Sequence, residues 1–422
     1  MTGISKASQV RSTTAVIGGG MVGMSIALSL LDAGEDVIVV ERNLPGCGCS
    51  FGNAGAISSG SVAPLAMPGL VTKIPGYLLD PLSPLHIRWR YLMRAAPWLW
   101  KFLRSAAPDR VEAISLALHE VLQRSIPAFQ RLVRRNAAAD LVAFTGQLHL
   151  YPDATQRAKD RQVWELRRAR GIAFREVDAG EIHDLEPEIG PSYAAGVFMP
   201  NEGMVRDPYR LVERLVENFL AGGGRIVRGE VVAVEFEDGE ARVLRTPQEA
   251  IRADKIVLAA GAWSGRFASL LGHRVPLQTQ RGYHVTHPNT EVRLTRPVVG
   301  ADVKCFVTPM DMGLRAAGTV EIDSLNSAPN FERARALNGY AKKLLPRLRV
   351  GRFTEWMGNR PCLPDSLPVI GRSPRFKSVY FAFGHGHLGL TEAPITAEVI
   401  TALIRGEEPP FDISPFRIDR FG

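Results

Sequence analysis

Residues 14–41 constrain the fold of this chain more than any other stretch of its 422 residues. A short β-favouring run is followed by a G-x-G-x-x-G motif at 18–23, then by apolar residues at helical spacing, and then by a second apolar run that ends on Glu41. This order predicts strand, turn, helix and strand. Such a unit is typical of the start of a nucleotide-binding α/β domain.

The three glycines of this motif each have a physical role. Gly18 permits the tight turn, Gly20 lets the backbone approach a pyrophosphate, and Gly23 lets helix and strand pack closely. The N-terminus of the helix then faces the phosphates with its partial positive charge. Glu41 follows Gly18 by 23 residues and can accept hydrogen bonds from ribose hydroxyls, whereas a turn made only for packing would leave this acid unexplained. The stretch therefore predicts dinucleotide binding.

The other parts of the nucleotide domain are scattered along the chain, which favours a flavoprotein over a simple NAD dehydrogenase. A loop at 46–55 is rich in small residues that let the backbone approach a flat ligand. Residues 224–235 are expected to form a hairpin. Residues 255–264 are expected to form a buried strand that stops at a turn containing Gly261.

A second G-x-G-x-x-G motif lies at 384–389, between an expected strand at 378–383 and an expected helix at about 394–404. The short tail that follows carries no second buried strand, so a second nucleotide-binding unit is not expected. We expect the amides of this turn and the helix N-terminus to point at an electron-rich group, such as the pyrimidine edge of a reduced flavin. His385 and His387 have no third metal ligand nearby in the sequence.

Composition and charge bound the class of protein. With 45% apolar and 22% charged residues the chain is neither disordered nor collagen-like. Its net charge of +8 permits several kinds of partner and selects none. The first fourteen residues contain no signal-peptide core and no run of eighteen apolar residues occurs, so we expect a cytoplasmic protein without a spanning helix. Cys47 and Cys49 lack the spacing of zinc or redox motifs, and no metal site is expected.

Four motifs together make the chain resemble the D-amino-acid oxidase superfamily of FAD-dependent oxidoreductases, closest to bacterial D-amino-acid dehydrogenases. They are the N-terminal unit, the segment 50–55 ending Asn-Ala-Gly, the turn at 258–261, and a C-terminal block at 358–371 that continues at 384–391. The resemblance covers nearly the whole chain. The form Gly-His-Gly-His-Leu-Gly-Leu-Thr at 384–391 is similar to that of hydroxy-D-proline dehydrogenases.

This resemblance implies an α/β fold in which a Rossmann-like FAD-binding domain is joined to a second, α+β substrate-binding domain. The FAD-binding domain is expected to be discontinuous, over 12–64, 200–268 and 356–410, and the substrate-binding domain to span 65–199 and 269–355. The residues expected at the FAD site are Gly18, Gly20, Met21, Val22, Gly23, Glu41, Arg42, Ser50, Asn53, Ala54, Gly55, Val231, Val232, Ala260, Gly261, Gly384, Gly386, His387, Leu388, Gly389, Leu390 and Thr391.

Oxidation of an amino acid moves a hydride from Cα to flavin N5, so the substrate carboxylate must be held in one orientation. An arginine fork suits this role, and the resemblance places it in the G-x-R-P stretch, at Arg360. The alternative is a surface arginine paired with Asp365. Tyr283 is the second candidate for substrate contact, with a core tyrosine as its alternative. His387 is expected to orient the substrate amine or a ring hydroxyl, and no strong base is needed if the bound amine first loses its proton.

The stretch 65–105 carries six cations against a single acid, Asp80, which accounts for five of the eight excess charges, and Trp89, Tyr91, Trp98, Trp100 and Phe102 lie among them. Aromatic rings interleaved with cations suit peripheral contact with a membrane surface. The alternative is a helix that packs its aromatics on the core and leaves its cations in water. Pro97 is expected to interrupt any long amphipathic helix here. The flavin site gives no reason to expect nucleic acid.

These observations lead to one expected function and two alternatives. We expect an FAD-dependent D-amino-acid dehydrogenase that acts on a D-amino acid, with a cyclic imino acid such as hydroxy-D-proline as a candidate substrate. Its electrons would pass to a quinone or another respiratory carrier, at the inner face of the cytoplasmic membrane. The first alternative is a glycine- or sarcosine-type oxidase that uses O2. The second is a flavin-bearing subunit of a heteromeric electron-transfer complex.

Overall fold

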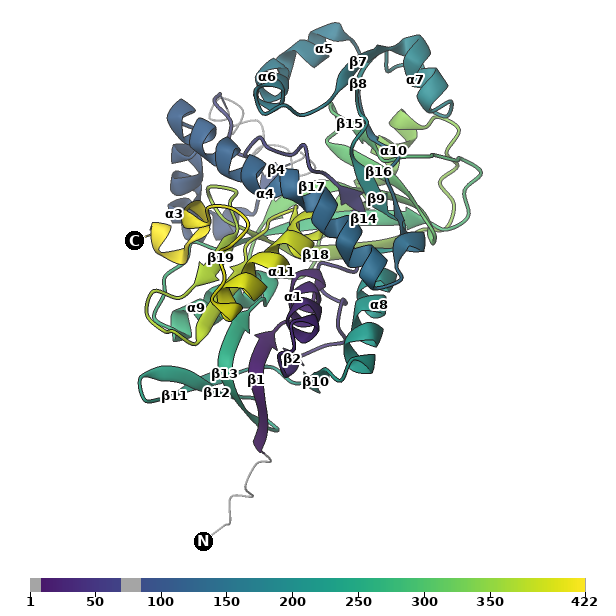
Figure 1. The fold of residues 1–422 in the computed structure, drawn as a ribbon. Helices are drawn as coiled ribbons and strands as arrows, with labels where there is room; N and C mark the ends of the chain where they lie inside the picture. The colour runs from purple at the N-terminus through teal and green to yellow at the C-terminus, as the bar shows by residue number, and fades with distance from the viewer. Residues whose placement is uncertain (1–8, 70–84, 422) are drawn as a thin grey trace.

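The computed structural model describes residues 9–69 and 85–421, and two large β-sheets dominate this part of the chain (Figure 1). Residues 70–84 of the predicted basic stretch, including Lys73 and Asp80, lie outside the described residues. Within the described ranges, no helix is both long enough and apolar enough to cross a membrane.

The first sheet contains the predicted strand–turn–helix–strand unit, now seen as β1 (Gln9–Ile17), α1 (Met21–Asp32) and β2 (Val37–Glu41). Strands β10, β2, β1, β13 and β20 lie side by side and run parallel, while β11, β12 and β19 are antiparallel to their neighbours. The bounds of these other strands are Arg225–Arg228 (β10), Ala233–Glu237 (β11), Glu240–Arg245 (β12), Ala250–Leu258 (β13), Val369–Arg372 (β19) and Val379–Phe383 (β20).

The hairpin predicted at 224–235 is wrong. β10 extends the parallel part of the sheet beside β2, and β11 instead pairs with β12. β10 follows helix α8 (Pro208–Ala221), and such a helical crossover is what brings a strand back parallel to its neighbour. Asp207 caps this helix, because its carboxylate accepts hydrogen bonds from the N–H groups of Tyr209 and Arg210 in the first turn.

Helices α1, α8 and α11 (Gly389–Arg405) pack together over the first sheet, and α4 (Pro108–Arg135) packs on α11 (Figure 1). Their apolar faces form a continuous buried cluster that includes Phe129 and Phe219. α4 lies in the range 65–199 that was expected to belong to the substrate-binding domain. The structure packs it against α11 of the nucleotide side, because the buried stripe of α4 matches the buried face of α11.

The second sheet runs in the order β18-β14-β17-β16-β15-β6-β8-β7, with β4 added beside β17. One face packs against α10 (Phe331–Leu344) around a second buried cluster. The strand bounds are Leu85–Ile87 (β4), Gln147–Tyr151 (β6), Arg175–Asp178 (β7), Ala195–Met199 (β8), Gln278–His287 (β14), Val298–Gly300 (β15), Cys305–Met310 (β16), Gly313–Ile322 (β17) and Thr354–Cys362 (β18).

Strand β18 crosses the domain boundary that was expected at residue 356. Its whole length pairs with β14, so Arg360 comes from the substrate-side sheet and not from the nucleotide side. A small third sheet is formed by β3, β9 and β5, which belong to segments of the chain that connect elements of the two large sheets. The remaining elements are β3 (Ala56–Ile57), β5 (Val142–Ala143), β9 (Gly203–Val205), α3 (Leu92–Arg104), α5 (Ala154–Lys159), α6 (Arg161–Ala169), α7 (Ala179–Leu185) and α9 (Ser264–Leu270).

Helix α3 corrects the expectation for Pro97. The helix runs through this proline without ending, with Pro97 as its sixth residue and its ring on the solvent side. A proline in a helix removes one hydrogen bond and can bend the helix, but it does not have to end it when one face of the helix packs well. Here Trp98 and Phe102 stack on each other and are buried.

Candidate active site

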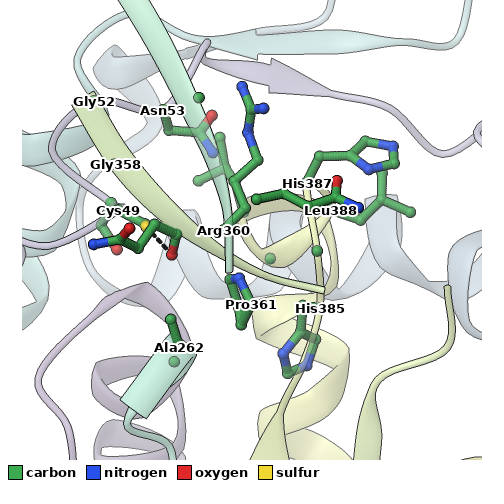
Figure 2. A pocket seen from close by; sticks show the side chains of 18 of the residues that line it. Cys49, Gly52, Asn53, Ala262, Gly358, Arg360, Pro361, His385, His387 and Leu388 are labelled. Atoms are coloured by element: carbon green, nitrogen blue, oxygen red, sulfur yellow. Dashed lines mark hydrogen bonds between the residues drawn. The ribbon is translucent and has the colours of Figure 1, made fainter. Parts of the chain in front are cut away.

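A cavity of about 910 Å³ lies where the two sheets face each other. Its wall combines both glycine-rich turns, the loop at 46–55 and residues of β14, β17 and β18 in the second sheet, which we call the substrate-side sheet. Figure 2 shows Arg360 between the loop that carries Asn53 and the turn that carries His387. Three parts of the chain far apart in sequence therefore meet at one site.

The first glycine-rich turn is so tightly packed that two of its positions have no room for a side chain. Gly18 has a φ of +109°, and a Cβ there would lie 2.5 Å from the carbonyl oxygen of Ala259. A Cβ on Gly23 would lie 1.9 Å from the carbonyl oxygen of Gly18. These contacts confirm the packing roles that the sequence predicts for the two glycines, and Gly23 itself does not line the cavity.

Around this turn, polar groups are arranged at the N-terminus of α1. The carboxylate of Glu41 accepts hydrogen bonds from the N–H of Gly19 at 2.7 Å and the N–H of Asn43 at 2.9 Å, and it borders the cavity. The hydroxyl of Ser50 accepts a hydrogen bond from the N–H of Met21 at 2.9 Å. These three hydrogen bonds hold an acid and the start of α1 beside the cavity.

The loop at 46–55 is tied to the substrate-side sheet. Arg315 donates a hydrogen bond to the carbonyl of Asn53 at 2.7 Å, and burial lowers the pKa of this arginine to about 10. The ring of Trp356 stacks on His284 with centroids 5.1 Å apart and covers Gly52, where a Cβ would lie 2.1 Å from the indole. The loop is therefore held flat against the strands, as a wall for a planar ligand requires.

The second glycine-rich turn also borders the cavity and lies between β20 and α11. The N–H of Gly386 donates to the carbonyl of Pro361 at 2.9 Å, which ties the turn to β18. The ring of His385 points away from the cavity's centre to Thr396, at 3.1 Å. His387 instead faces the cavity, and the surrounding protein together with the Arg360 cation lowers its pKa to about 4. Its imidazole is therefore neutral at neutral pH.

Arg360 is the cation beside the second glycine-rich turn, and Arg42, Arg167, Arg266 and Lys304 border other parts of the cavity. Its guanidinium lies flat over the backbone of Gly282, where a Cβ would lie 2.2 Å from Cζ, and Nη1 donates to the carbonyl of Thr319 at 3.1 Å. Burial lowers its pKa, but an arginine stays protonated in proteins. The alternative pairing with Asp365 is wrong, because Asp365 forms its ion pair with Arg420 at 2.8 Å.

Thr319 holds Arg360 from a strained backbone position. Its φ is +57°, which is rare for a β-branched residue and costs of order 1–3 kcal/mol. It lies where the pairing of β14 with β17 shifts register between Arg281 and Tyr283. The bulge turns the Thr319 carbonyl toward the guanidinium, and Thr319 borders the cavity while its buried hydroxyl has no hydrogen-bond partner among the described residues.

Tyr283 does not present its hydroxyl to a ligand. The hydroxyl donates to Glu321 at 2.5 Å and accepts from the N–H of Asn330 at 3.1 Å, on the α10 side of the sheet. Burial and this carboxylate raise the Tyr283 pKa to about 12. Glu321 also pairs with the fully buried Arg281 at 3.0 Å. Tyr283 borders the cavity, but its hydroxyl belongs to a buried ionic cluster, as its core alternative predicted.

The structure places most of the predicted FAD-site residues on the cavity wall and four of them outside it. Val232 is 41% exposed and its N–H donates to the carbonyl of Arg245, so it belongs to the outer surface. Thr391 accepts from the N–H of Ser58 behind the wall. Gly23 and Gly55 serve packing and a turn. The predicted residues that do border the cavity are Gly18, Gly20, Met21, Val22, Glu41, Arg42, Ser50, Asn53, Ala54, Val231, Ala260, Gly261, Gly384, Gly386, His387, Leu388, Gly389 and Leu390.

Several residues of the wall escaped sequence reasoning. Gly282 and Thr319 form the seat of Arg360, and Trp356 covers the loop, but single residues of these types carry no local signal. Cys49 donates a hydrogen bond to the carbonyl of Asn359 at 2.7 Å, and burial raises its pKa to about 11, so it is a neutral thiol in the wall.

Comparison with known proteins decides the family. Residues 13–403 match the sequence profile of the family described as FAD dependent oxidoreductase, which covers most of the chain. The chain belongs to this family. It is 37% identical over 414 residues to a D-amino-acid oxidase of Bradyrhizobium diazoefficiens, covering 96% of this chain and 98% of that one. It is 30% identical to a D-amino acid dehydrogenase of Paramagnetospirillum magneticum, with 96% and 98% of the two chains covered.

Solved structures give the same fold. Glycine oxidase from Geobacillus kaustophilus superposes with a TM-score of 0.76 at 20% identity, covering 97% of this chain and 98% of that one. The L-proline dehydrogenase from P. horikoshii superposes with a TM-score of 0.75 at 21% identity, covering 98% of each chain. These likenesses confirm the predicted α/β fold with an FAD-binding and a substrate-binding part.

FAD is the cofactor of this family, and the cavity fits it. The first turn offers bare backbone at Gly18 and Gly20, with the N-terminus of α1 and the acid Glu41 beside it, as an adenine dinucleotide requires. The flat loop wall and the N-terminus of α11 lie farther along the same cavity. The glycines at 18 and 23 leave no space that a side chain could fill, which explains why the cradle is made of backbone.

Proposed function

We propose that this chain is an FAD-dependent D-amino-acid dehydrogenase. The observation that carries the proposal is Arg360, a cation on the cavity wall beside the second glycine-rich turn. It forms no ion pair with any carboxylate of the described residues. A cation in such surroundings is costly unless an anion reaches it, and the carboxylate of an amino acid is the anion that an arginine fork binds in two places.

The residues around Arg360 divide the work of binding and orientation. Thr319 and Gly282 fix the plane of the guanidinium, so the bound carboxylate has one orientation. His387, neutral because its pKa is lowered to about 4, can accept a hydrogen bond from the substrate amine or a ring hydroxyl. Bound FAD supplies the acceptor of the Cα hydride, at N5. No described residue of the wall needs to act as a strong base if the bound amine loses its proton before the hydride is transferred.

The choice of D-amino acids as substrates rests on two relatives, one named an oxidase and the other named a dehydrogenase. The relatives named above are a D-amino-acid oxidase and a D-amino acid dehydrogenase, and both span nearly the whole chain. The motif at 384–391 supports a cyclic imino acid such as hydroxy-D-proline as substrate. We propose a quinone or another respiratory carrier as the electron acceptor, and oxygen is the second candidate because the 37% identical relative is named an oxidase.

The purified holoenzyme tests this proposal by flavin bleaching without oxygen. We expect D-amino acids, including D-proline and hydroxy-D-proline, to reduce the flavin, and their L-enantiomers to do so at least about tenfold more slowly. Oxygen uptake compared with anaerobic dye reduction then separates a dehydrogenase from an oxidase. If glycine or sarcosine bleaches the flavin faster than any D-amino acid, the substrate class is wrong. If no amine bleaches the isolated chain, the role of a flavin-bearing subunit gains support.

A further inference from the structure

The outer side of helix α3 and of the short helix η2 (Trp89–Tyr91) carries an unusual set of side chains. Three large apolar side chains project into solvent, with exposed fractions of 64% for Trp89, 83% for Met93 and 57% for Trp100. Exposed cations flank them. We call the following seven residues the α3 surface: Trp89, Arg90, Met93, Arg94, Trp100, Lys101 and Arg104.

The spacing of these residues places them on one side of the helix. Trp89, Met93 and Trp100 are separated by four and seven residues, which is the repeat of a single helical face. The opposite face is formed by Ala95, Trp98 and Phe102, which are buried in a hydrophobic cluster of their own. The exposed aromatics are therefore not needed to hold α3 on the protein.

The charged side chains of η2 and α3 are all cationic. Between residues 85 and 107 the sequence contains no Asp or Glu. Arg90, Arg94, Lys101 and Arg104 form no ion pair with a carboxylate of the described residues, and Arg104 lies over the ring of Trp100 at 4.6 Å. Arg88 differs from these four, because it is paired with Glu321 at 3.0 Å and with Asp323 at 3.1 Å.

The inner face of the same helix borders the active-site cavity. Trp98, Leu99 and Phe102 line it, together with Leu85 of β4 and Ile322 of β17. This part of the wall is apolar, unlike the part around Arg360. One helix thus separates the cavity from the cationic, aromatic outer side, at the left edge of the molecule in Figure 1.

We propose that the α3 surface binds an anionic lipid bilayer. Tryptophan and methionine side chains at this spacing can enter the headgroup region, while the cations beside them meet the lipid phosphates and anionic headgroups. A second copy of the same surface is a poor partner, because four like charges would face four like charges. The opposing surface must therefore be both negatively charged and able to take up apolar side chains.

The proposal adds a reason to the choice of electron acceptor, and in this respect it rests on the proposed function. Binding through the α3 surface brings the apolar part of the cavity wall next to the bilayer, where a lipid-soluble carrier is dissolved. Trp98, Leu99 and Phe102 are the side chains of α3 between the cavity and the proposed bilayer. Membrane binding itself does not depend on which amine is oxidised, so the two ideas fail separately.

The test is co-sedimentation of the holoenzyme with two kinds of vesicle. One kind contains phosphatidylcholine alone, and the other also contains roughly 30% phosphatidylglycerol as the anionic lipid. We expect the wild-type protein to sediment with the anionic vesicles at low salt and to be released by high salt. The triple variant Arg90→Glu, Arg94→Glu, Lys101→Glu should lose at least tenfold in partitioning. The double variant Trp89→Ser, Trp100→Ser should lose binding even at low salt.

A matched control reverses three exposed cations elsewhere, Lys342→Glu, Arg349→Glu and Arg352→Glu, with the same change in net charge. The control and the α3 variants should keep dye-linked activity within twofold of wild type. The proposal is overturned if the wild type stays in the supernatant with anionic vesicles at low salt, or if the control loses binding as much as the α3 variant. It is also overturned if the α3 variants instead dissociate an oligomer in solution.

Discussion

The two glycine-rich turns of this molecule share one sequence pattern and differ in what the pattern does. Each turn follows a parallel strand of the first sheet, opens a helix and borders the same cavity. In the first turn, a Cβ on Gly23 would lie 1.9 Å from a backbone oxygen. In the second, a Cβ on Gly389 would lie 3.5 Å from the Cβ of His385, which is ordinary contact.

This difference shows that G-x-G-x-x-G describes two separate functions. The first turn is a packing joint whose backbone and neighbouring acid, Glu41, face the cavity. The second turn presents a side chain, His387, and the N-terminus of α11 next to Arg360. The first should therefore tolerate no added atoms, and the second should be sensitive to the side chains around it.

The largest effect is expected for Gly23→Ala. The new methyl group would collide with the Gly18 carbonyl, so α1 must move away from β1. We expect the variant to retain little or no FAD and to lose several °C in melting temperature, measured by flavin content and thermal unfolding. Gly389→Ala is the matched control for the melting temperature, at the start of α11, where alanine should be neutral or stabilising by up to about 1 kcal/mol. Equal damage in both variants would contradict the comparison.

The next effect concerns the partner of the second turn. Arg360→Met removes the cation that holds the substrate carboxylate, so we expect the substrate dissociation constant to rise by at least about 100-fold, roughly 2.7 kcal/mol. Flavin content should stay at the wild-type level. Arg360→Lys should fall between the two, because lysine keeps the charge and loses the fork. A Met variant that binds substrate normally would remove Arg360 from the site.

Glu41→Ala probes the acid of the first turn. We expect FAD to bind about ten- to a hundredfold more weakly, because a buried hydrogen-bonding acceptor is worth about 1–3 kcal/mol. Titration of the apoprotein with FAD, followed by quenching of flavin fluorescence, measures this change. Asp36→Ala is the control, an exposed acid just before β2 that pairs with Arg225. Similar losses in both variants would mean that the acid acts through the strand and not through the ligand.

The smallest effect concerns Glu392 in the first turn of α11, a position at which α1 has no acid. Both oxygens of Glu392 are buried and lack hydrogen-bond partners among the described residues, and burial raises its pKa well above the usual value. The folded state therefore holds the proton longer than the unfolded state does. Stability contributed by this group is present at low pH and is lost as pH rises above about 4.5, by up to about 1.4 kcal/mol per pH unit.

Glu392→Gln removes this titration and keeps the shape of the side chain. We expect its melting temperature relative to wild type to increase steadily from pH 5 to pH 8, as measured by thermal unfolding of the two holoenzymes. A difference that does not change with pH would show that Glu392 is not held neutral in the fold.

Local signals in the sequence were enough for the nucleotide-binding end. Glycine spacing, apolar periodicity and a terminal acid occur within 28 residues, so α1 and β2 could be predicted almost to their ends, whereas β1 begins at Gln9, five residues before the predicted start at 14. The same holds for the strand before the second turn, β20. The turns, apolar periodicity and end signals that define these elements all come from residues close to one another in the chain.

The substrate side depends on contacts that no local pattern records. The hydroxyl of Tyr283 is directed by Glu321, 38 residues away, and the seat of Arg360 needs the bulge at Thr319. The family resemblance supplied Arg360, but the sequence could not tell its partner, and the suggested Asp365 is paired elsewhere. Helix α3 shows the same limit, since Pro97 is accommodated because the inner face of the helix packs well.

The most direct test of the central claim compares a D-amino acid with its own amide in the anaerobic reductive half-reaction of the wild-type holoenzyme. The amide keeps the Cα hydrogen and the amine and lacks only the carboxylate that Arg360 is proposed to hold. We expect the D-acid to bleach the flavin with saturation at low concentration and the amide to require at least about 100-fold more, a gap that disappears in Arg360→Met. Equal bleaching of the wild type by acid and amide would contradict it.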